Sequence, residues 1–161
     1  MKTLLLCLFL LLTPFATTAE TLAGKVVGVH DGDTLTLLDH SKRQIKIRLA
    51  EIDAPESRQP YGSRSKQELS GLAFGKSVAV QVQDIDRYGR TVGRITVDGV
   101  DVNAEMVRRG AAWVYRKYAK DQSLFTIEKQ ARDAKAGLWA LPEADRMPPW
   151  EWRKMSKAST K

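Results

Sequence analysis

Two pairs of carboxylates stand where predicted strands begin or end. Asp31 and Asp33 flank a glycine in HDGDTLTL, and Asp53 and Glu56 follow in RLAEIDAPE. We expect Asp33 to open one strand and Asp53 to close the next, so that antiparallel pairing brings both carboxylates to one edge of the sheet. A group of oxygens without cysteine is typical of a site for a hard divalent cation, Ca²⁺ or Mg²⁺, rather than zinc.

Each motif also has a plain structural interpretation, and the residues alone leave it open. Asp31 and Gly32 would form a hairpin turn, and Asp53 would be a loop residue ahead of Pro55. An EF-hand is excluded because, counted from Asp31, that pattern requires an oxygen ligand at the position of Leu35.

Basic residues supply the third part of the pattern. The stretch DRYGR at residues 86–90 follows a predicted strand, and Arg48 precedes the second carboxylate pair. An arginine beside a glycine turn is usually a solvated loop charge. Near one metal site, however, Arg48 and Arg90 could bind a phosphate bidentately and stabilise the charge that develops on it under attack. Together these groups are the components that phosphodiester hydrolysis needs.

Strands and helices must position these residues, and the hydrophobic pattern predicts their order. Alternation predicts five strands, over residues 21–32, 33–39, 43–52, 77–83 and 91–102. Apolar stripes and glycine stops predict three helices, over residues 63–75, 103–110 and 123–137. Ser65 and Glu68 form the pattern of a capping box at the first helix. This order favours a β-barrel with helices (α+β), a five-stranded OB-fold barrel with three α-helices.

The first 19 residues have the pattern of a Sec-type signal peptide. Lys2 precedes the apolar run LLLCLFLLL, and small residues precede the expected cleavage after Ala19. The run is too short for a stable bilayer anchor. Cleavage would remove Cys7, the single cysteine, and with it any cysteine nucleophile or disulfide. We therefore expect a secreted or periplasmic protein without membrane attachment.

The mature chain is expected to form one domain followed by a short tail. Residues 20–142 would be the domain, and residues 143–161 a basic tail that contains proline and tryptophan. In that tail we expect Pro148 to Trp152 to pack against the domain and the last residues to be frayed. The formal net charge of +7 falls by one when Lys2 is lost. A positive excess suits a polyanionic partner but does not identify one.

The motifs DGDT, RLAEIDAPE and DRYGR, in this order and spacing, resemble the staphylococcal nuclease (thermonuclease) family. VNAEMVRRGAAWVY is similar to that family's next segment, so the resemblance extends from about Val26 to Trp139. It implies an OB barrel and a Ca²⁺-dependent, monomeric hydrolase of DNA and RNA. It also implies little sequence specificity and products that end in 3′-phosphate.

The resemblance assigns the metal and the attacking water to four residues. Asp33 and Asp53 resemble carboxylate ligands of calcium, and the backbone carbonyl of Ala54 resembles a third ligand. Ala54 replaces a threonine of the best-known member, which matters little where a carbonyl binds the metal. Glu56 resembles the residue that orients or deprotonates the attacking water. The loop after Glu56 is shorter than in that member.

Six further residues resemble positions that contact the substrate. These are Arg48 and Arg90 at the scissile phosphate, Arg87 and Tyr88 at a neighbouring phosphate, and Trp113 and Tyr115 in the nucleotide pocket. The main alternative is a non-catalytic OB-fold module that binds nucleic acid or a protein, as in relatives that have lost catalytic residues. That alternative predicts gaps among the carboxylates and arginines, and here all five catalytic and metal-binding side chains are present. The basic tail leaves an adhesion function as a further alternative.

Overall fold

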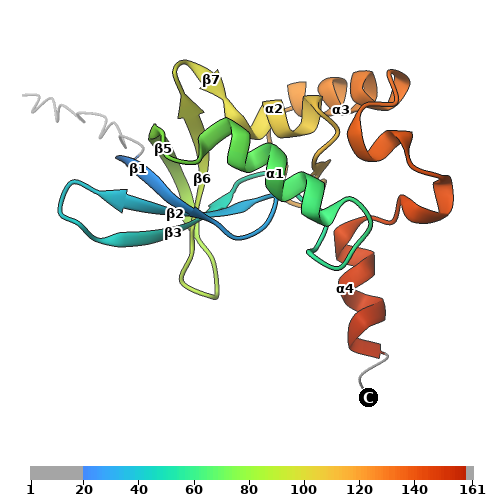
Figure 1. Ribbon diagram of the computed structural model, residues 1–161, viewed down its shortest axis with the longest axis horizontal. Helices are drawn as coiled ribbons and strands as arrows, with labels where there is room; N and C mark the ends of the chain where they lie inside the picture. Colours follow the sequence, from blue (N-terminus) through green and yellow to red (C-terminus); the bar gives the residue numbers. More distant parts are fainter. Residues whose placement is uncertain (1–19, 159–161) are drawn as a thin grey trace, which may run out of the picture.

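The computed structural model describes residues 20–158 (Figure 1). The predicted signal peptide, residues 1–19, lies outside the described residues. Within residues 20–158, no helix combines the length and apolar character that crossing a membrane requires.

Five strands of the described chain close into a barrel. They are β1 (Thr21–Val29), β2 (Thr34–Asp39), β3 (Gln44–Leu49), β5 (Ser77–Ile85) and β6 (Thr91–Val97). They pair in the order β3-β2-β1-β5-β6, and a parallel pairing of β3 with β6 completes the ring. A two-residue strand, β7 (Val100–Asp101), extends β6 as a hairpin. The predicted α+β barrel of OB type is confirmed.

The described residues contain four α-helices, one more than the sequence predicts. They are α1 (Gly62–Ala73), α2 (Val102–Arg108), α3 (Ser123–Asp133) and α4 (Pro149–Ala158). Two 3₁₀ turns, η1 (Gly137–Ala140) and η2 (Glu143–Asp145), lie between α3 and α4. The additional helix is α4, which occupies the segment expected to be a partly frayed tail. Proline at its first position suits a helix start, and side-chain contacts with β4 (Ile52–Asp53), β8 (Trp113–Val114) and the segments that follow them, described below, hold it.

The first helix begins earlier than the sequence predicts, and the capping box is wrong. Ser65 lies inside α1, fully buried, and its Oγ donates a hydrogen bond to the carbonyl of Ala111 at 2.6 Å. The helix begins instead after Tyr61, which has a left-handed backbone and no side-chain capping bond. The Ser65 side chain thus makes a tertiary hydrogen bond instead of capping the helix.

The strand predicted over residues 43–52 is interrupted. β3 ends at Leu49, and Glu51 adopts a left-handed conformation with φ of 66°. The chain then forms β4 (Ile52–Asp53), which pairs with β8 (Trp113–Val114) in a separate two-stranded sheet. Asp53 therefore does not close the strand that pairs with β2, because the turn at Glu51 redirects the chain.

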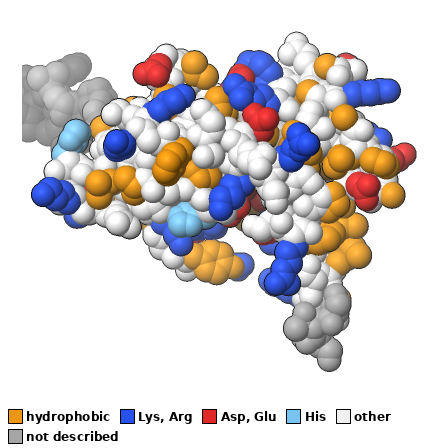
Figure 2. Space-filling view, in the orientation of Figure 1, with side chains coloured by type: hydrophobic (Ala, Val, Ile, Leu, Met, Phe, Trp, Pro, Cys, Tyr) orange, Lys and Arg blue, Asp and Glu red, His pale blue; other side chains and the backbone are white. Residues whose placement is uncertain are grey.

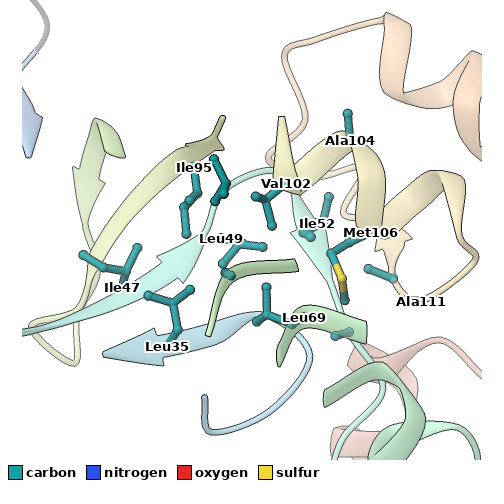
Figure 3. Packing of buried hydrophobic residues seen from close by; sticks show 14 of the residues in the cluster. Leu35, Ile47, Leu49, Ile52, Leu69, Ile95, Val102, Ala104, Met106 and Ala111 are labelled. Carbon is teal, nitrogen blue, oxygen red and sulfur yellow. The ribbon is translucent and has the colours of Figure 1, made fainter. Parts of the chain in front are cut away.

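The main hydrophobic core fills the barrel and continues beneath α1 and α2 (Figure 3). Ile47 and Leu49 lie on the inward face of β3, as alternation predicts, and Leu69 and Met106 contribute from α1 and α2. Each of these side chains is at most 1% exposed. Burying one such side chain contributes roughly 1.5–3 kcal/mol. This core fixes the strands and helices that carry the polar residues described next.

Candidate functional site

The loop between β1 and β2 is pressed against α1, and this explains its glycine. A Cβ at Gly32 would lie 1.8 Å from Ser65 Oγ and 2.7 Å from the Cβ of Ala54. Gly32 is not among the residues with positive φ, so close approach rather than turn geometry requires it. Asp31 Oδ1 accepts the N–H of Asp33 at 3.0 Å and orders the loop.

Asp33 connects this loop to β4. Its carboxylate is buried and accepts the N–H of Ala54 at 2.8 Å through Oδ2 and the hydroxyl of Thr34 at 3.0 Å through Oδ1. Arg48 Nη1 lies 3.1 Å from the same Oδ2. Burial raises the pKa of Asp33, and the positive charge of Arg48 opposes that rise.

Arg48 joins the two aspartates that the sequence predicts to meet. Its Nη2 donates to Asp53 Oδ1 at 2.9 Å, and its Nη1 also donates to the carbonyls of Leu49 and Ile52, both at 3.0 Å. The side chain of Arg48 is 13% exposed and that of Asp53 is 1% exposed. Asp33 and Asp53 are therefore neighbours around one buried guanidinium, although Asp53 arrives from β4.

A residue that sequence analysis missed completes this cluster. Arg153 of α4 donates to both oxygens of Asp53, at 3.1 Å to Oδ1 and 2.7 Å to Oδ2. Its Nη1 also donates to Glu56 Oε1 at 2.7 Å. Although desolvation acts to lower it, these hydrogen bonds leave the pKa of Arg153 above its usual value. No local signal marks this arginine, because its partners lie about a hundred residues away in the chain.

Glu56 lies at the accessible side of the cluster. Its side chain is 39% exposed, whereas Asp53 is buried. The Glu56 N–H donates to Gln59 Oε1 at 3.1 Å, and Gln59 also donates to the carbonyl of Met147. The loop that carries Glu56 is thus tied to the segment that leads into α4. Burial raises the pKa of Asp53, against hydrogen bonds from Arg153.

The turn between β5 and β6 presents the second predicted arginine. Asp86 accepts the backbone N–H of Arg90 at 3.0 Å and its Nε at 2.7 Å. Although desolvation acts to raise it, these hydrogen bonds lower the pKa of Asp86. Arg90 Nη1 lies 3.5 Å from Thr34 Oγ1, beside Asp33, so the structure brings Arg90 to the carboxylate cluster.

Arg87 and Tyr88 lie at the exposed tip of this turn. Arg87 Nη2 donates to the Tyr88 hydroxyl at 2.7 Å, and its guanidinium lies 4.8 Å from the centre of the ring. Both side chains face solvent. On the face shown in Figure 2, blue Lys and Arg side chains are spread over the barrel and helices and red carboxylates are fewer. This distribution suits a polyanionic ligand.

The two aromatic residues predicted for a nucleotide pocket differ in burial. Trp113 is 8% exposed and packs edge-on against Trp139 at 4.4 Å, with the Arg132 guanidinium over both rings. Trp113 is thus largely buried, and its role as a nucleotide contact stays a prediction. Tyr115 is half-buried, and its ring stacks on Trp150 of α4 with centroids 5.3 Å apart.

The residues present suit a hard cation in chemistry, although they are few. Among residues 20–158, no group of three or more His, Asp or Glu side chains is arranged around one metal position. Asp33 and Asp53 offer carboxylate oxygens, which Ca²⁺ prefers, and carbonyl and water oxygens would have to complete its six to eight ligands. The hydrogen bond seen for Ala54 involves its N–H, so ligation by its carbonyl stays a prediction.

Comparison with known proteins places these residues in a family context. The family model described as staphylococcal nuclease homologue matches residues 46–141. An uncharacterized endonuclease of Escherichia coli O157:H7 is 47% identical over 131 residues, which cover 81% of this chain and 84% of that protein. A micrococcal nuclease of Shigella flexneri is 43% identical over 148 residues, covering 85% and 83%. The family match includes Arg48, Asp53, Glu56 and Arg90 but ends before α4.

Proposed function

Because the chain belongs to the staphylococcal nuclease family, we propose that it is an exported, calcium-dependent nuclease. It would hydrolyse phosphodiester bonds of DNA and RNA with little sequence specificity and leave 3′-phosphate ends. Similarity to proteins named endonuclease and micrococcal nuclease supports the nuclease activity. The observation that carries the finer proposal is the meeting of Asp33 and Asp53 at one guanidinium, beside Glu56 and Arg90.

Asp33, Asp53 and the carbonyl of Ala54 would hold Ca²⁺ in this proposal. When bound, the cation lowers the pKa of a water molecule and polarises a phosphoryl oxygen. Two buried carboxylates and no cysteine among residues 20–158 favour a hard cation over zinc.

Glu56 would act on the attacking water, since it is the carboxylate of the cluster that reaches solvent. It would accept a proton from the water while the water oxygen bonds to phosphorus and the bond from phosphorus to the 5′-oxygen breaks. The 5′-oxygen would leave with the electron pair of that bond and take a proton from solvent water. Arg90, held by Asp86 near Thr34, would donate to the phosphoryl oxygens as charge builds up on them. Arg48 is already bound to Asp33 and Asp53, and from there it would contribute a fixed positive charge.

Outside the reacting group, exposed side chains would contact a phosphate and one half-buried aromatic ring would contact a nucleotide. Arg87 and Tyr88 extend from the β5–β6 turn into solvent and are placed to contact a neighbouring phosphate. Contacts to phosphate carry no base information, so little sequence specificity is expected. Tyr115 would be the aromatic that contacts a nucleotide, since Trp113 is buried.

Plasmid DNA incubated with the purified protein tests this proposal. We expect cutting with Ca²⁺ and its loss on addition of a chelator. Glu56→Gln should cut about 10²- to 10⁴-fold more slowly, the scale of a general base. Glu68→Gln, on α1 and paired with Arg109, is the matched control and should cut like the wild type. If the wild type binds DNA but does not cut it under any of these conditions, the non-catalytic module is the better description.

Export is tested separately. Expressed in a bacterium with its own leader, the protein should leave the cytoplasm and begin at Glu20. N-terminal sequencing that finds Met1 on the active protein would contradict the predicted cleavage.

A further inference from the structure

Helix α4 contacts the candidate site at two separate places. In Figure 1 it projects from the body of the molecule, and it follows directly on the segment that Gln59 holds through Met147. Arg153, on the second turn of α4, reaches Asp53 and Glu56, and Trp150, on its first turn, reaches Tyr115. These partners were assigned above to the metal, the attacking water and the nucleotide. One helix thus covers positions that the proposed reaction needs.

The contact with Asp53 conflicts with metal binding. Oδ1 of Asp53 accepts from both Arg48 and Arg153, and Oδ2 accepts from Arg153 at 2.7 Å. Both carboxylate oxygens are therefore engaged by guanidinium groups. A divalent cation that uses Asp53 must take at least one oxygen from a guanidinium, because a cation repels a positive group on the same oxygen.

Arg48 and Arg153 differ in how readily each can dissociate from Asp53. Arg48 is 13% exposed, lies on β3 within the barrel and donates to two backbone carbonyls as well as to Asp33 and Asp53. Arg153 is 37% exposed and lies on a helix in which Pro149 alone among its described residues is buried. Elements with few buried contacts open at low free-energy cost. Arg153 is thus the arginine that can dissociate from Asp53.

The contact between Trp150 and Tyr115 also blocks a position that the proposed reaction needs. The ring of Trp150 stacks on Tyr115 with planes 4° apart, and it also lies edge-on to Trp113 at 6.0 Å. A stacked tryptophan covers a ring face that a nucleobase would use. The aromatic contact and the ion pair are different in chemistry, yet both close the same site.

We infer that α4 is a C-terminal latch on the site. Arg153 acts as a built-in cation on Asp53 and Glu56, Trp150 covers Tyr115, and calcium and nucleic acid bind by displacing the helix. This inference rests on the proposed function. The apparent affinity for calcium is then reduced by the fraction of molecules in which the latch is open.

Calorimetric titration of the full-length protein with Ca²⁺ tests the latch. If the latch is closed in about nine molecules of ten, Arg153→Gln should bind Ca²⁺ about tenfold more tightly than the wild type. Lys154→Gln is the matched control, because Lys154 is on the same helix, carries the same charge and pairs with Glu151 instead of Asp53. It should leave the affinity unchanged.

A second variant separates the latch from a simple change of local charge. Trp150→Ala keeps every charge of the site but removes the stack on Tyr115, and it should tighten calcium binding about threefold by opening the latch. An increase in Arg153→Gln with none in Trp150→Ala would overturn the latch, since charge removal alone would then explain the result.

Hydrogen exchange of the wild type provides a readout that needs no variant. Because linkage is reciprocal, calcium must open the latch if the latch hinders calcium. Amides of α4 should therefore exchange faster when Ca²⁺ is bound, and unchanged or slower exchange would overturn the inference.

The outcomes distinguish this inference from the proposed function. Calcium binding that Asp53→Ala abolishes, with no effect of Arg153→Gln or Trp150→Ala, overturns the latch and leaves the function standing. No calcium binding in the wild type and in Arg153→Gln alike overturns both.

Discussion

Glu51 and Asp53 lie two residues apart, both are nearly buried, and their carboxylates are stabilised in opposite ways. Glu51 is 8% exposed. Its Oε2 accepts the backbone N–H groups of Lys120 and Asp121, both at 2.9 Å, and its Oε1 accepts Gln83 Nε2 at 3.1 Å. Although desolvation acts to raise it, these hydrogen bonds lower the pKa of Glu51. The fold therefore favours the ionised form.

Asp53 has different partners. The hydrogen bonds to its carboxylate come from the side chains of Arg48 and Arg153. Burial raises its pKa despite these cations. Backbone donors cannot move away without unfolding, whereas a guanidinium on a flexible side chain can. Glu51 thus has a structural role. The carboxylate of Asp53 can exchange one partner for another, which a group that binds a ligand must be able to do.

The largest effect is expected at the fixed cation of this pair. Arg48→Ala would leave Asp33 and Asp53 buried without their shared guanidinium, and breaking a buried ion pair costs about 3–5 kcal/mol. Urea unfolding at neutral pH measures this loss. Arg153→Gln should lower the free energy of unfolding by only about 1.4 kcal/mol, which corresponds to the tenfold effect expected for a latch closed in nine molecules of ten. Similar losses in both variants would contradict the distinction between a fixed and a removable cation.

Asp53→Asn tests the carboxylate itself. The amide keeps an acceptor for Arg48 but has no charge for a cation, so the rate of Ca²⁺-started digestion of single-stranded DNA should fall about 10²- to 10³-fold, the scale of losing a preorganised electrostatic group. Because burial raises the pKa of this carboxyl, its ionisation costs stability, so at neutral pH this variant should be no less stable than the wild type. A wild-type rate in this variant would show that Asp53 is not a ligand.

Glu51→Gln is the same chemical change two residues earlier, with the opposite expected outcome. The lost charge weakens hydrogen bonds from Lys120, Asp121 and Gln83, and bonds to charged groups are worth about 1.5–3 kcal/mol. We expect a loss of stability in this range and a normal digestion rate for the folded protein. Loss of activity without loss of stability would place Glu51 in the site.

The smallest effect is the pH dependence, and its sign differs between the two residues. The pKa of Glu51 is below 4.5 in the fold, so its stabilising effect is complete above pH 4.5 and is lost as pH falls towards the folded value. The pKa of Asp53 is above 3.8, so ionisation costs stability as pH rises from 3.8 to the folded value.

Urea unfolding from pH 3.5 to 7 measures both. The deficit of Glu51→Gln relative to the wild type should shrink below pH 4.5. Asp53→Asn should gain relative stability as pH rises above 3.8. Two variants with parallel pH profiles would remove the distinction between the carboxylates.

Much of the fold was predictable because the alternation of apolar and polar residues indicates strands locally. Alternation placed Ile47 and Leu49 on one face of β3, where both are buried. The helix boundaries were less predictable. Ser65 has the pattern of a cap, yet it bonds to Ala111, which is distant in the chain. Local capping rules do not predict the hydrogen bond of a polar side chain whose partner is distant in the chain.

The sequence by itself determined which groups could do chemistry. Asp33, Asp53, Glu56, Arg48 and Arg90 follow from residue type and from their positions at strand ends, and the structure brings all five together. Asp33, Arg48 and Arg90 converge because β2, β3 and β6 are neighbours in the barrel, so short motifs some tens of residues apart reach the same rim. Asp53 and Glu56 reach that rim through β4, outside the barrel.

Only the tertiary structure decided how these groups are held and covered. It buried Trp113 against Trp139, and it brought Arg153 to Asp53 and Trp150 to Tyr115. The hydrophobic pattern around Arg153 does not indicate that its partner Asp53 lies about a hundred residues earlier in the chain. Such contacts depend on the path of the chain after α3, because the charge and shape that attract Arg153 arise only when β4, the Glu56 loop and α4 occupy their places.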